Sequence, residues 1–433
     1  MIKSYLLDGE FKERTFDDFT EISEIVNANR KNIYGLKLDI IIEFLTKLGR
    51  KIIRDKTINT IDGVSYISLW LRKDDLEKIC RLNYLDQRYF ENFEKTENNF
   101  ELCAQPRGIV CHWVAGNIPT LAFFSLIQSI LSKNGSIVKV PEENKDIILT
   151  ILKHLYEIKV EVDGKAYYGE DIVSSISIVS FDGKNYENSK NFSLIADCKI
   201  IWGGYDAVSA VTALPQKEHC EIISFGPKYS FGVFDREYIE SEYFEKAIEN
   251  SVMDIAIFNQ MACSSPHVFF FEKNKYSLKE IAQKMEFYFE KLPDKLLKQI
   301  TPQGTAGEII NKRGMHLLED DKEILKSNDL SWTILINKDI TLEEPVQGKC
   351  IFLKEIDNVD EVLDLITRKI QAMGVCILNP EKRRGFAKEA TYNGVDRIVI
   401  PGKMHDFDLP WDGILILNRL VRWVILKGDR NAK

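Results

Sequence analysis

From about residue 109 onward, short apolar runs alternate with stretches whose apolar residues recur every three or four positions. The apolar runs predict strands at residues 109–114, 136–140, 176–179, 199–202 and 221–225. The stretches between them predict helices at residues 118–132, 146–158, 186–196 and 206–214. Near-continuous apolar strands joined by helices are typical of a parallel sheet that is covered on both faces. This part of the chain therefore predicts an α/β domain, in which ligands bind at the carboxyl ends of the strands.

The second half repeats the alternation and predicts a second α/β domain. Strands are predicted at residues 268–271, 332–336, 349–353, 375–378 and 397–401. Helices are predicted at residues 238–260, 277–291, 306–318, 359–373 and 384–391. These patterns divide the chain into a helical N-terminal region (1–97), a first α/β domain (98–226), a second (227–405) and a C-terminal segment (406–433). The last segment contains a predicted apolar helix at residues 414–426, which we expect to pack back to complete the first domain or to lie at a subunit interface.

Composition and charge narrow the class of protein. The 433 residues are 45% hydrophobic and 29% charged, as is ordinary for an enzyme, and the formal net charge of −8 is spread without a basic block. Because nucleic acids are bound by clustered lysine and arginine, we do not expect nucleic acid as the main partner. The eight cysteines form no CxxC pair and the six histidines no HExxH motif, so neither a metal site nor a disulfide framework is predicted.

One apolar stretch has the length of a membrane span. Residues 109–132 contain no Asp, Glu, Lys or Arg, but His112, Gly116, Pro119 and Gln128 interrupt them. A buried strand, turn and helix fits this pattern better. The N-terminus has charged residues within its first ten positions and no apolar signal core. We therefore expect no transmembrane segment and a cytoplasmic location.

Residues suited to chemistry stand at the ends of predicted elements. Cys263 lies in a turn of small residues between a predicted helix and a strand, where a nucleophile is held rigidly without being covered. The alternative is an inert buried thiol, which is the usual state of a free cysteine. Gly203 and Gly204 follow a strand and open a helix, which suits a phosphate because the first helical N–H groups are unpaired. A tight turn between strand and helix explains the glycine pair equally well.

From about residue 106 to the end, four motifs in the right order resemble those of the aldehyde dehydrogenase superfamily. They are Trp202-Gly203-Gly204, Phe225-Gly226-Pro227-Lys228-Tyr229-Ser230, Gln260-x-Ala262-Cys263-Ser264-Ser265-Pro266 and Pro410-Trp411-Asp412-Gly413. Within the superfamily the chain is similar to the long-chain acyl reductases that supply aldehyde in bacterial bioluminescence, the LuxC family. The resemblance implies an aldehyde dehydrogenase-like α/β fold, with a Rossmann-type parallel-sheet cofactor domain at residues 98–226 and a catalytic domain at residues 227–405.

The resemblance also implies roles for individual residues. Cys263 matches the nucleophile, and Asn117 matches the asparagine whose amide helps to bind the oxyanion. The other matches concern a nicotinamide cofactor: Lys139 for the adenosine ribose or its phosphate, Gly203 and Gly204 for the pyrophosphate, and Glu344, or Glu343 beside it, for the nicotinamide ribose. NADPH is the expected cofactor, with NADH as the alternative.

The implied function is the reduction of a fatty acyl thioester to the aldehyde through an acyl-Cys263 intermediate. The acyl group would arrive on coenzyme A or on a protein, with an acyl-protein synthetase and an acyl-transferase as candidate partners, and we expect a homo-oligomer. Oxidative relatives carry a glutamate base for hydrolysis where this chain has Ser224, which favours reduction. Two alternatives stay open: NAD(P)-dependent oxidation of free aldehyde, which Ser224 disfavours, and an inactive aldehyde dehydrogenase-like scaffold.

Overall fold

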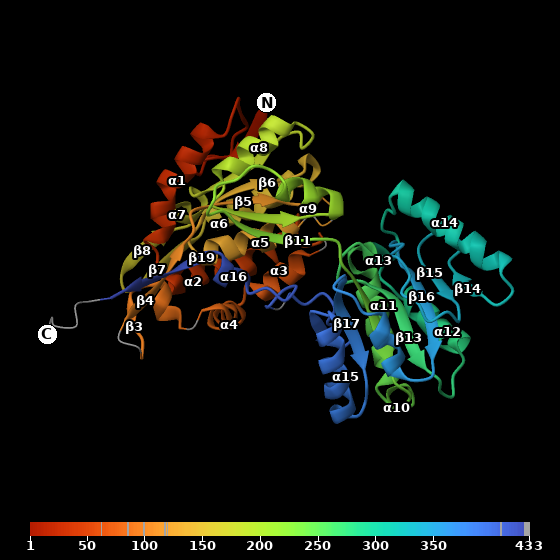
Figure 1. Ribbon diagram of the computed structural model, residues 1–433. Coiled ribbons are helices and arrows are strands. Elements are labelled where there is room, and N and C mark those ends of the chain that lie inside the picture. The colour runs from red at the N-terminus through yellow and green to blue at the C-terminus, as the bar shows by residue number, and fades with distance from the viewer. Residues whose placement is uncertain are drawn as a thin grey trace. The chain divides into compact units, whose positions relative to one another are not determined.

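The computed structural model describes residues 1–61, 63–84, 86–97, 100–116, 118, 120–407 and 409–427. The chain forms two compact units (Figure 1), one made of Met1–Gly226 with Phe407–Lys433 and the other of Pro227–Asp406. Each unit is built on a seven-stranded sheet of its own. Among the helices of the described ranges, none has the length and apolar character that crossing a membrane requires.

The sheet of the first unit contains the strands predicted after residue 109 and two more from the N-terminus. In spatial order the strands are β11 (Glu221–Phe225), β10 (Cys198–Trp202), β5 (Ile109–Trp113), β6 (Gly135–Lys139), β9 (Ile176–Ser180), β1 (Ile2–Leu6) and β2 (Arg14–Phe16). The strands from β11 to β9 are parallel, whereas β1 is antiparallel to β9 and β2 is antiparallel to β1. The prediction of a helical region at residues 1–97 is therefore wrong at its start, because β1 pairs with a strand far along the chain.

Helices cover both faces of this sheet. One face packs against α2 (Leu38–Ile52), α3 (Val64–Trp70), α4 (Lys73–Asn83), α5 (Leu121–Leu131), α6 (Lys145–Tyr156) and α7 (Glu170–Val173). The opposite face packs against α1 (Thr20–Tyr34), α8 (Tyr186–Ile195) and α9 (Tyr205–Thr212). Successive strand residues point to opposite faces, so Ile200 joins the first core and Ile201 the second. Two single turns, η1 (Gln87–Phe90) and η2 (Glu142–Asn144), also lie in this part of the unit.

The strand order places a topological switch point between β5 and β10. From β5 the chain adds β6 and β9 on one side, then crosses back and adds β10 and β11 on the other. The connections leave the two central strands in opposite directions, and ligands of open α/β sheets bind at the carboxyl ends of such a strand pair. Gly116 follows β5 and Gly203 follows β10. The predicted phosphate turn therefore lies at the place where this sheet is expected to bind a ligand.

The C-terminal segment contains a strand where the apolar pattern predicts a helix. The helix α16 (Ile416–Arg419) is a single turn, and β19 (Val421–Leu426) follows it. β19 pairs with β4 (Glu101–Pro106), which also pairs with β3 (Glu94–Lys95). The helix prediction for residues 414–426 is wrong because a short apolar run suits either element and the partner strand decides. A further two-stranded hairpin consists of β7 (Lys159–Val162) and β8 (Lys165–Tyr168).

The sheet of the second unit is parallel except at one edge. In spatial order its strands are β14 (Glu323–Lys326), β15 (Thr333–Ile336), β16 (Cys350–Ile356), β13 (Pro266–Glu272), β12 (Tyr229–Phe234), β17 (Ile370–Cys376) and β18 (Arg397–Val399). Only the edge strand β14 is antiparallel to its neighbour among these pairs. One face packs against α11 (Phe244–Ala256), α12 (Leu278–Glu290) and α13 (Asp294–Leu297), and the other against α14 (Gln303–Leu318), α15 (Pro380–Asn393) and η4 (Val359–Leu365).

Two helices predicted in this unit are broken. The stretch at residues 238–260 divides into the end of α10 (Arg236–Ile239), then α11 and η3 (Ile257–Gln260). The stretch at residues 359–373 divides into η4 and the first half of β17. Apolar residues continue across both breaks, and every residue of β17 is buried. Periodicity alone therefore could not locate where the helices end.

Candidate active site

Cys263 lies in the turn between η3 and β13, and its side chain is half-buried. The backbone before the turn is left-handed at three successive residues, Phe258, Asn259 and Gln260, with φ of +57°, +51° and +61°. Because side chains disfavour this conformation, such a run persists only where the surroundings hold it in place. The turn stands at the amino end of β13, so the carboxyl-end rule, which fits the first sheet, does not apply to this residue.

Two buried polar side chains hold the Cys263 turn. Ser230 Oγ donates to the carbonyl oxygen of Cys263 at 2.8 Å and accepts from the N–H of Ala372 at 3.1 Å. Gln260 Nε2 donates to the carbonyl oxygens of Pro266 at 2.8 Å and Cys350 at 3.0 Å, and its Oε1 accepts from the Cys350 N–H at 2.8 Å. The turn is thus fastened to β12, β16 and β17, which is the rigid support that a nucleophile needs.

The eight cysteines, all within the described residues, form no disulfide and differ in exposure. Six of them are buried, and Cys220 and Cys263 are half-buried. Burial raises the pKa of Cys80 and of Cys350 to about 12, which keeps both groups protonated at neutral pH. Burial also raises the pKa of Cys220. Exposure and position in the turn therefore distinguish Cys263 from the buried, inert thiols.

The neighbouring glutamates before β16 have different surroundings. Glu343 Oε1 accepts from the fully buried ammonium of Lys354 at 3.2 Å and from the Asn337 amide at 3.3 Å. Burial alone would raise the pKa of Glu343, but Lys354 and these hydrogen bonds outweigh it and lower the pKa. Glu344 is exposed, and its charge adds to burial in raising the pKa of Tyr229 at the start of β12. Glu343 is thus paired internally, whereas Glu344 faces solvent.

Lys139 ends β6 in the first unit, at the carboxyl end of that strand, where a ligand is expected. Its Nζ lies 4.8 Å from the centre of the Phe181 ring, which follows β9. Burial lowers the pKa of Lys139, and the nearby Asp182 carboxylate opposes that shift. A partly desolvated ammonium binds an anionic or hydroxyl ligand more strongly than one in water does.

Gly203 and Gly204 form the turn from β10 into α9. The Gly203 N–H donates to the Phe225 carbonyl oxygen at 3.2 Å, which continues the pairing of β10 with β11. A side chain at Gly203 would have its Cβ 3.0 Å from the Cβ of Ala207, whereas a Cβ at Gly204 would meet open space. The unpaired N–H groups at the start of α9 are therefore accessible from the Gly204 side, as a bound phosphate requires.

Asn117, the predicted oxyanion ligand, lies outside the described residues. The neighbouring carbonyl oxygen of Gly116 accepts from Asn144 Nδ2 at 2.9 Å, which fixes the chain just after β5 to the turn after β6.

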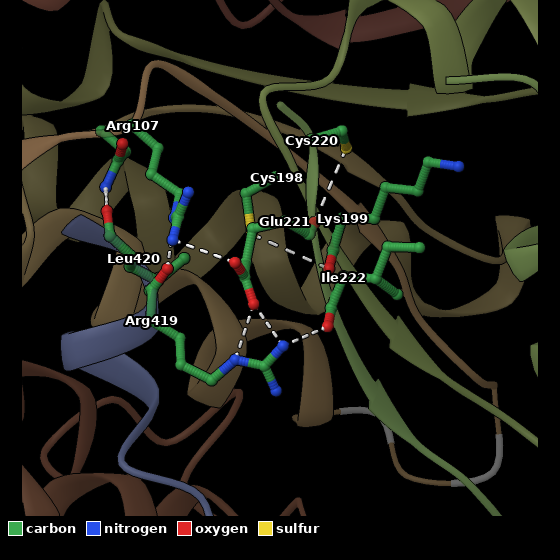
Figure 2. A network of polar contacts seen from close by, with 9 residues as sticks. Arg107, Cys198, Lys199, Cys220, Glu221, Ile222, Arg419 and Leu420 are labelled. Carbon is green, nitrogen blue, oxygen red and sulfur yellow. Dashed lines mark hydrogen bonds and ion pairs between the residues drawn. The ribbon is translucent and has the colours of Figure 1, made fainter. Parts of the chain in front are cut away.

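Ser224 and Glu221 lie on the edge strand β11 and point to opposite faces of it. Ser224 is exposed, and Glu221 shares its face with Ile223 and Phe225, as the odd offset from Ser224 predicts. Glu221 accepts from Arg419 Nε at 2.7 Å and lies 2.9 Å from Arg107 Nη2. Figure 2 shows the carboxylate between the two guanidinium groups. Glu221 is therefore a structural tie to the C-terminal segment and cannot replace the base that is missing at Ser224.

With this geometry established, comparison with known proteins identifies the family. A sequence model of the family described as Acyl-CoA reductase (LuxC) matches residues 40–423. This chain belongs to the LuxC family of acyl-CoA reductases. The long-chain acyl-protein thioester reductase of Photorhabdus luminescens is 24% identical over 434 residues, covering 94% of this chain and 85% of that protein. The enzyme of the same name from Vibrio harveyi is 25% identical over 329 residues, covering 74% of this chain and 64% of that protein.

Solved aldehyde dehydrogenases share the fold of this LuxC-family chain. Aldehyde dehydrogenase 21 of Physcomitrella patens, solved with the product succinate, superposes with a TM-score of 0.72 at 10% identity, covering 98% of this chain and 93% of that one. Aldehyde dehydrogenase C of Pseudomonas syringae, solved with NAD+ and octanal, superposes with a TM-score of 0.69 at 12% identity, covering 100% of this chain and 94% of that one. At such identities the likeness establishes the aldehyde dehydrogenase-like fold.

The site residues of this LuxC-family chain fall into two groups. Lys139, Gly203 and Gly204 belong to the first unit, and Cys263 and Glu344 belong to the second. Sequence reasoning missed the residues that brace the Cys263 turn. Ser230 belongs to the motif at residues 225–230, but that motif assigns it no role. His405 belongs to none of the motifs. The hydrogen bond of His405 to the turn spans 141 positions, which no local pattern reveals.

Proposed function

We propose that this protein reduces a fatty acyl thioester to the aldehyde, with NADPH as the reductant, through an acyl group carried on Cys263. Membership of the acyl-CoA reductase family is the observation that carries the proposal. The half-buried thiol in a braced turn supports the choice of nucleophile, because the other half-buried cysteine, Cys220, lies in no such turn. The rest of the proposal assigns each step to residues of this chain.

The first step is acyl transfer. The Cys263 thiolate attacks the thioester carbonyl carbon, the carbonyl oxygen becomes an oxyanion, and the thiolate of the donor leaves as the new thioester forms. We assign oxyanion binding to the Asn117 amide and a main-chain N–H of the Cys263 turn, each of which should lower the barrier by about 3 kcal/mol. When the acyl group is reduced, the carbonyl re-forms as aldehyde and the Cys263 thiolate is released unchanged.

The residues fit a nicotinamide cofactor. Gly204 leaves space at the start of α9 for a pyrophosphate, Lys139 offers a cation for the adenosine ribose or its phosphate, and exposed Glu344 offers a carboxylate for the nicotinamide ribose. A bound reduced nicotinamide supplies the hydride. We choose Glu344 over Glu343 because Glu343 already accepts from buried Lys354.

The acyl donor and the cofactor can be tested in one experiment. We propose acyl-CoA or an acyl-protein thioester as the donor, an acyl-protein synthetase and an acyl-transferase as partners, and a homo-oligomer as the working form. The decisive experiment follows nicotinamide absorbance with acyl-CoA substrates of increasing chain length, each offered with NADPH and with NADH. Oxidation of the cofactor that depends on acyl-CoA, with aldehyde as product, is expected. Turnover only in the direction of aldehyde oxidation would refute the proposal.

Replacing Lys139 by alanine should raise the KM for NADPH by about tenfold or more, since a charge-assisted contact to a ligand contributes about 1.5–3 kcal/mol. Acylation of Cys263 should change less, because a cation near the ribose acts on cofactor binding. The measurements are KM and, by nicotinamide fluorescence, Kd for NADPH and NADH. Lys190→Ala, which removes a partly exposed ammonium that pairs with Glu187 on α8, is the matched control. Equal weakening of both cofactors would show that Lys139 does not read a 2′-phosphate.

Replacing Ser224 by glutamate should divert the acyl-enzyme toward hydrolysis. The position is exposed, so a carboxylate there can reach water, and a general base contributes about 10²–10⁴-fold when water is within hydrogen-bond reach. The measurement is the release of free fatty acid from acyl-CoA without reduced cofactor. Ser224→Gln, which adds the same bulk without a base, is the control. If the parent protein hydrolyses acyl-CoA as fast as the Ser224→Glu variant does, the lack of a base at Ser224 does not explain reduction, and aldehyde oxidation becomes the favoured function.

A further inference from the structure

His405, in the segment after β18, holds the Cys263 turn from the side. Its Nδ1 lies 2.9 Å from Ser264 Oγ, and its Nε2 lies 2.7 Å from the carbonyl oxygen of Asp254 in the last turn of α11. The ring also meets Phe258 edge-on, with centroids 5.3 Å apart and an interplanar angle of 83°. His405 therefore contacts the chain before the nucleophile, the residue directly after it, and the helix that leads to it.

The two hydrogen bonds fix where the ring hydrogen lies. A carbonyl oxygen only accepts, so Nε2 must carry a hydrogen and donate it to Asp254. The ring is uncharged at neutral pH because burial lowers the pKa of His405 to about 4. Nδ1 of this neutral ring is bare and accepts the hydrogen of the Ser264 hydroxyl. The side chain next to the nucleophile is thus held in one orientation.

The segment that carries His405 is itself anchored on both sides. The Gly402 N–H donates to the Asp254 carboxylate at 2.5 Å, and Arg397 donates to the carbonyl oxygens of Met404 at 3.3 Å and Asp406 at 2.7 Å. Asp254 is 2% exposed and His405 is 5% exposed. The imidazole is therefore a fixed support, enclosed by protein and out of reach of a substrate.

We propose that His405 is a positioning residue for the nucleophile: through Ser264 it holds Cys263 where the thiol can attack. This inference rests on the proposed function of Cys263. A displacement of about 1 Å at a reacting atom can cost about 10²-fold in rate. Because the ring does not touch the substrate, the loss falls on the rate constant of acyl transfer and leaves the KM for the thioester unchanged.

Variants that keep one hydrogen bond at a time test the proposal. His405→Asn keeps an acceptor near the Nδ1 position, toward Ser264, and His405→Gln keeps a donor near the Nε2 position, toward Asp254. Ser264→Ala removes a single hydroxyl, and Ser264→Thr restores it. The matched control is Ser125→Ala, which removes a hydroxyl 2.7 Å from Nδ1 of another buried histidine, His112, in the first unit. Each variant is mixed with acyl-CoA at several concentrations, quenched, and analysed for the acyl adduct by mass spectrometry.

We expect His405→Gln and Ser264→Ala to acylate about 10²-fold more slowly at saturating acyl-CoA, with KM unchanged, as displacement of the nucleophile predicts. His405→Asn and Ser264→Thr should keep most of the parental rate, and Ser125→Ala all of it. If His405→Gln does not fold, Ser264→Ala decides. Parental acylation by a folded Ser264→Ala protein, or a loss confined to KM, overturns the positioning role. Absence of an adduct in the parent protein overturns instead the nucleophile assignment.

Discussion

Cys263→Ala will abolish formation of the covalent acyl-enzyme while nicotinamide binding stays near the parental level. The reason is that the thiol is the group that bonds to the acyl carbon, whereas the residues proposed for the dinucleotide are Lys139, Gly203, Gly204 and Glu344. The experiment mixes the protein with acyl-CoA in the absence of cofactor and records the mass of the intact chain. The parent should gain one acyl group, and the variant none.

The chain offers a matched control for this experiment. Cys220 is the other half-buried thiol, and burial raises its pKa, so Cys220→Ala should still acquire the acyl group. An adduct that persists in Cys263→Ala, or that disappears in Cys220→Ala, would show that the nucleophile has been assigned to the wrong residue. If the parent and both variants bind the nicotinamide cofactor but none of them forms an acyl adduct, the inactive scaffold is supported instead.

Gln260→Leu is expected to destabilise the second unit by about 2 kcal/mol or more and to slow acyl transfer. Gln260 is fully buried, and leucine would remove the donor to the carbonyl oxygens of Pro266 and Cys350. The Cys350 N–H would lose its 2.8 Å bond to Gln260 and keep the longer one, 3.3 Å, to the Gln347 carbonyl oxygen. Each buried main-chain group left unpaired costs about 1–3 kcal/mol. Because the same bonds hold the left-handed run before Cys263, the turn should lose its geometry as well.

Urea unfolding and the acylation rate measure the two effects separately. Gln303→Leu is the control, since Gln303 is exposed at the start of α14 and its replacement should change neither quantity much. A Gln260→Leu protein as stable as the parent would mean that water or a shifted backbone replaces the lost hydrogen bonds. Loss of stability with a parental acylation rate would show that the turn does not depend on Gln260.

Several elements could be predicted from the sequence because their patterns are local. β11 spans residues 221–225 as its apolar run predicts, and α8 and α12 end within a residue of their predicted bounds. The failures occur where apolar residues continue across a break. The stretch at residues 359–373 changes from η4 to β17, and residues 414–426 change from a single helical turn to β19. In both, a neighbouring strand decides the conformation, and no local pattern records that neighbour.

The sequence by itself determined the kind of chemistry and the motifs that carry it. Cys263, Gly203, Gly204 and Lys139 could be proposed as site residues because each stands in a short motif at the end of a strand or turn, and chain order alone fixes those positions. Only the tertiary structure decided what supports them. The Cys263 turn is held by contacts between separate elements, through Ser230, Gln260 and His405. The Glu221 carboxylate is paired with Arg107 and Arg419. Hydrogen bonds of this kind depend on which elements fold side by side, so they exist only in the packed chain.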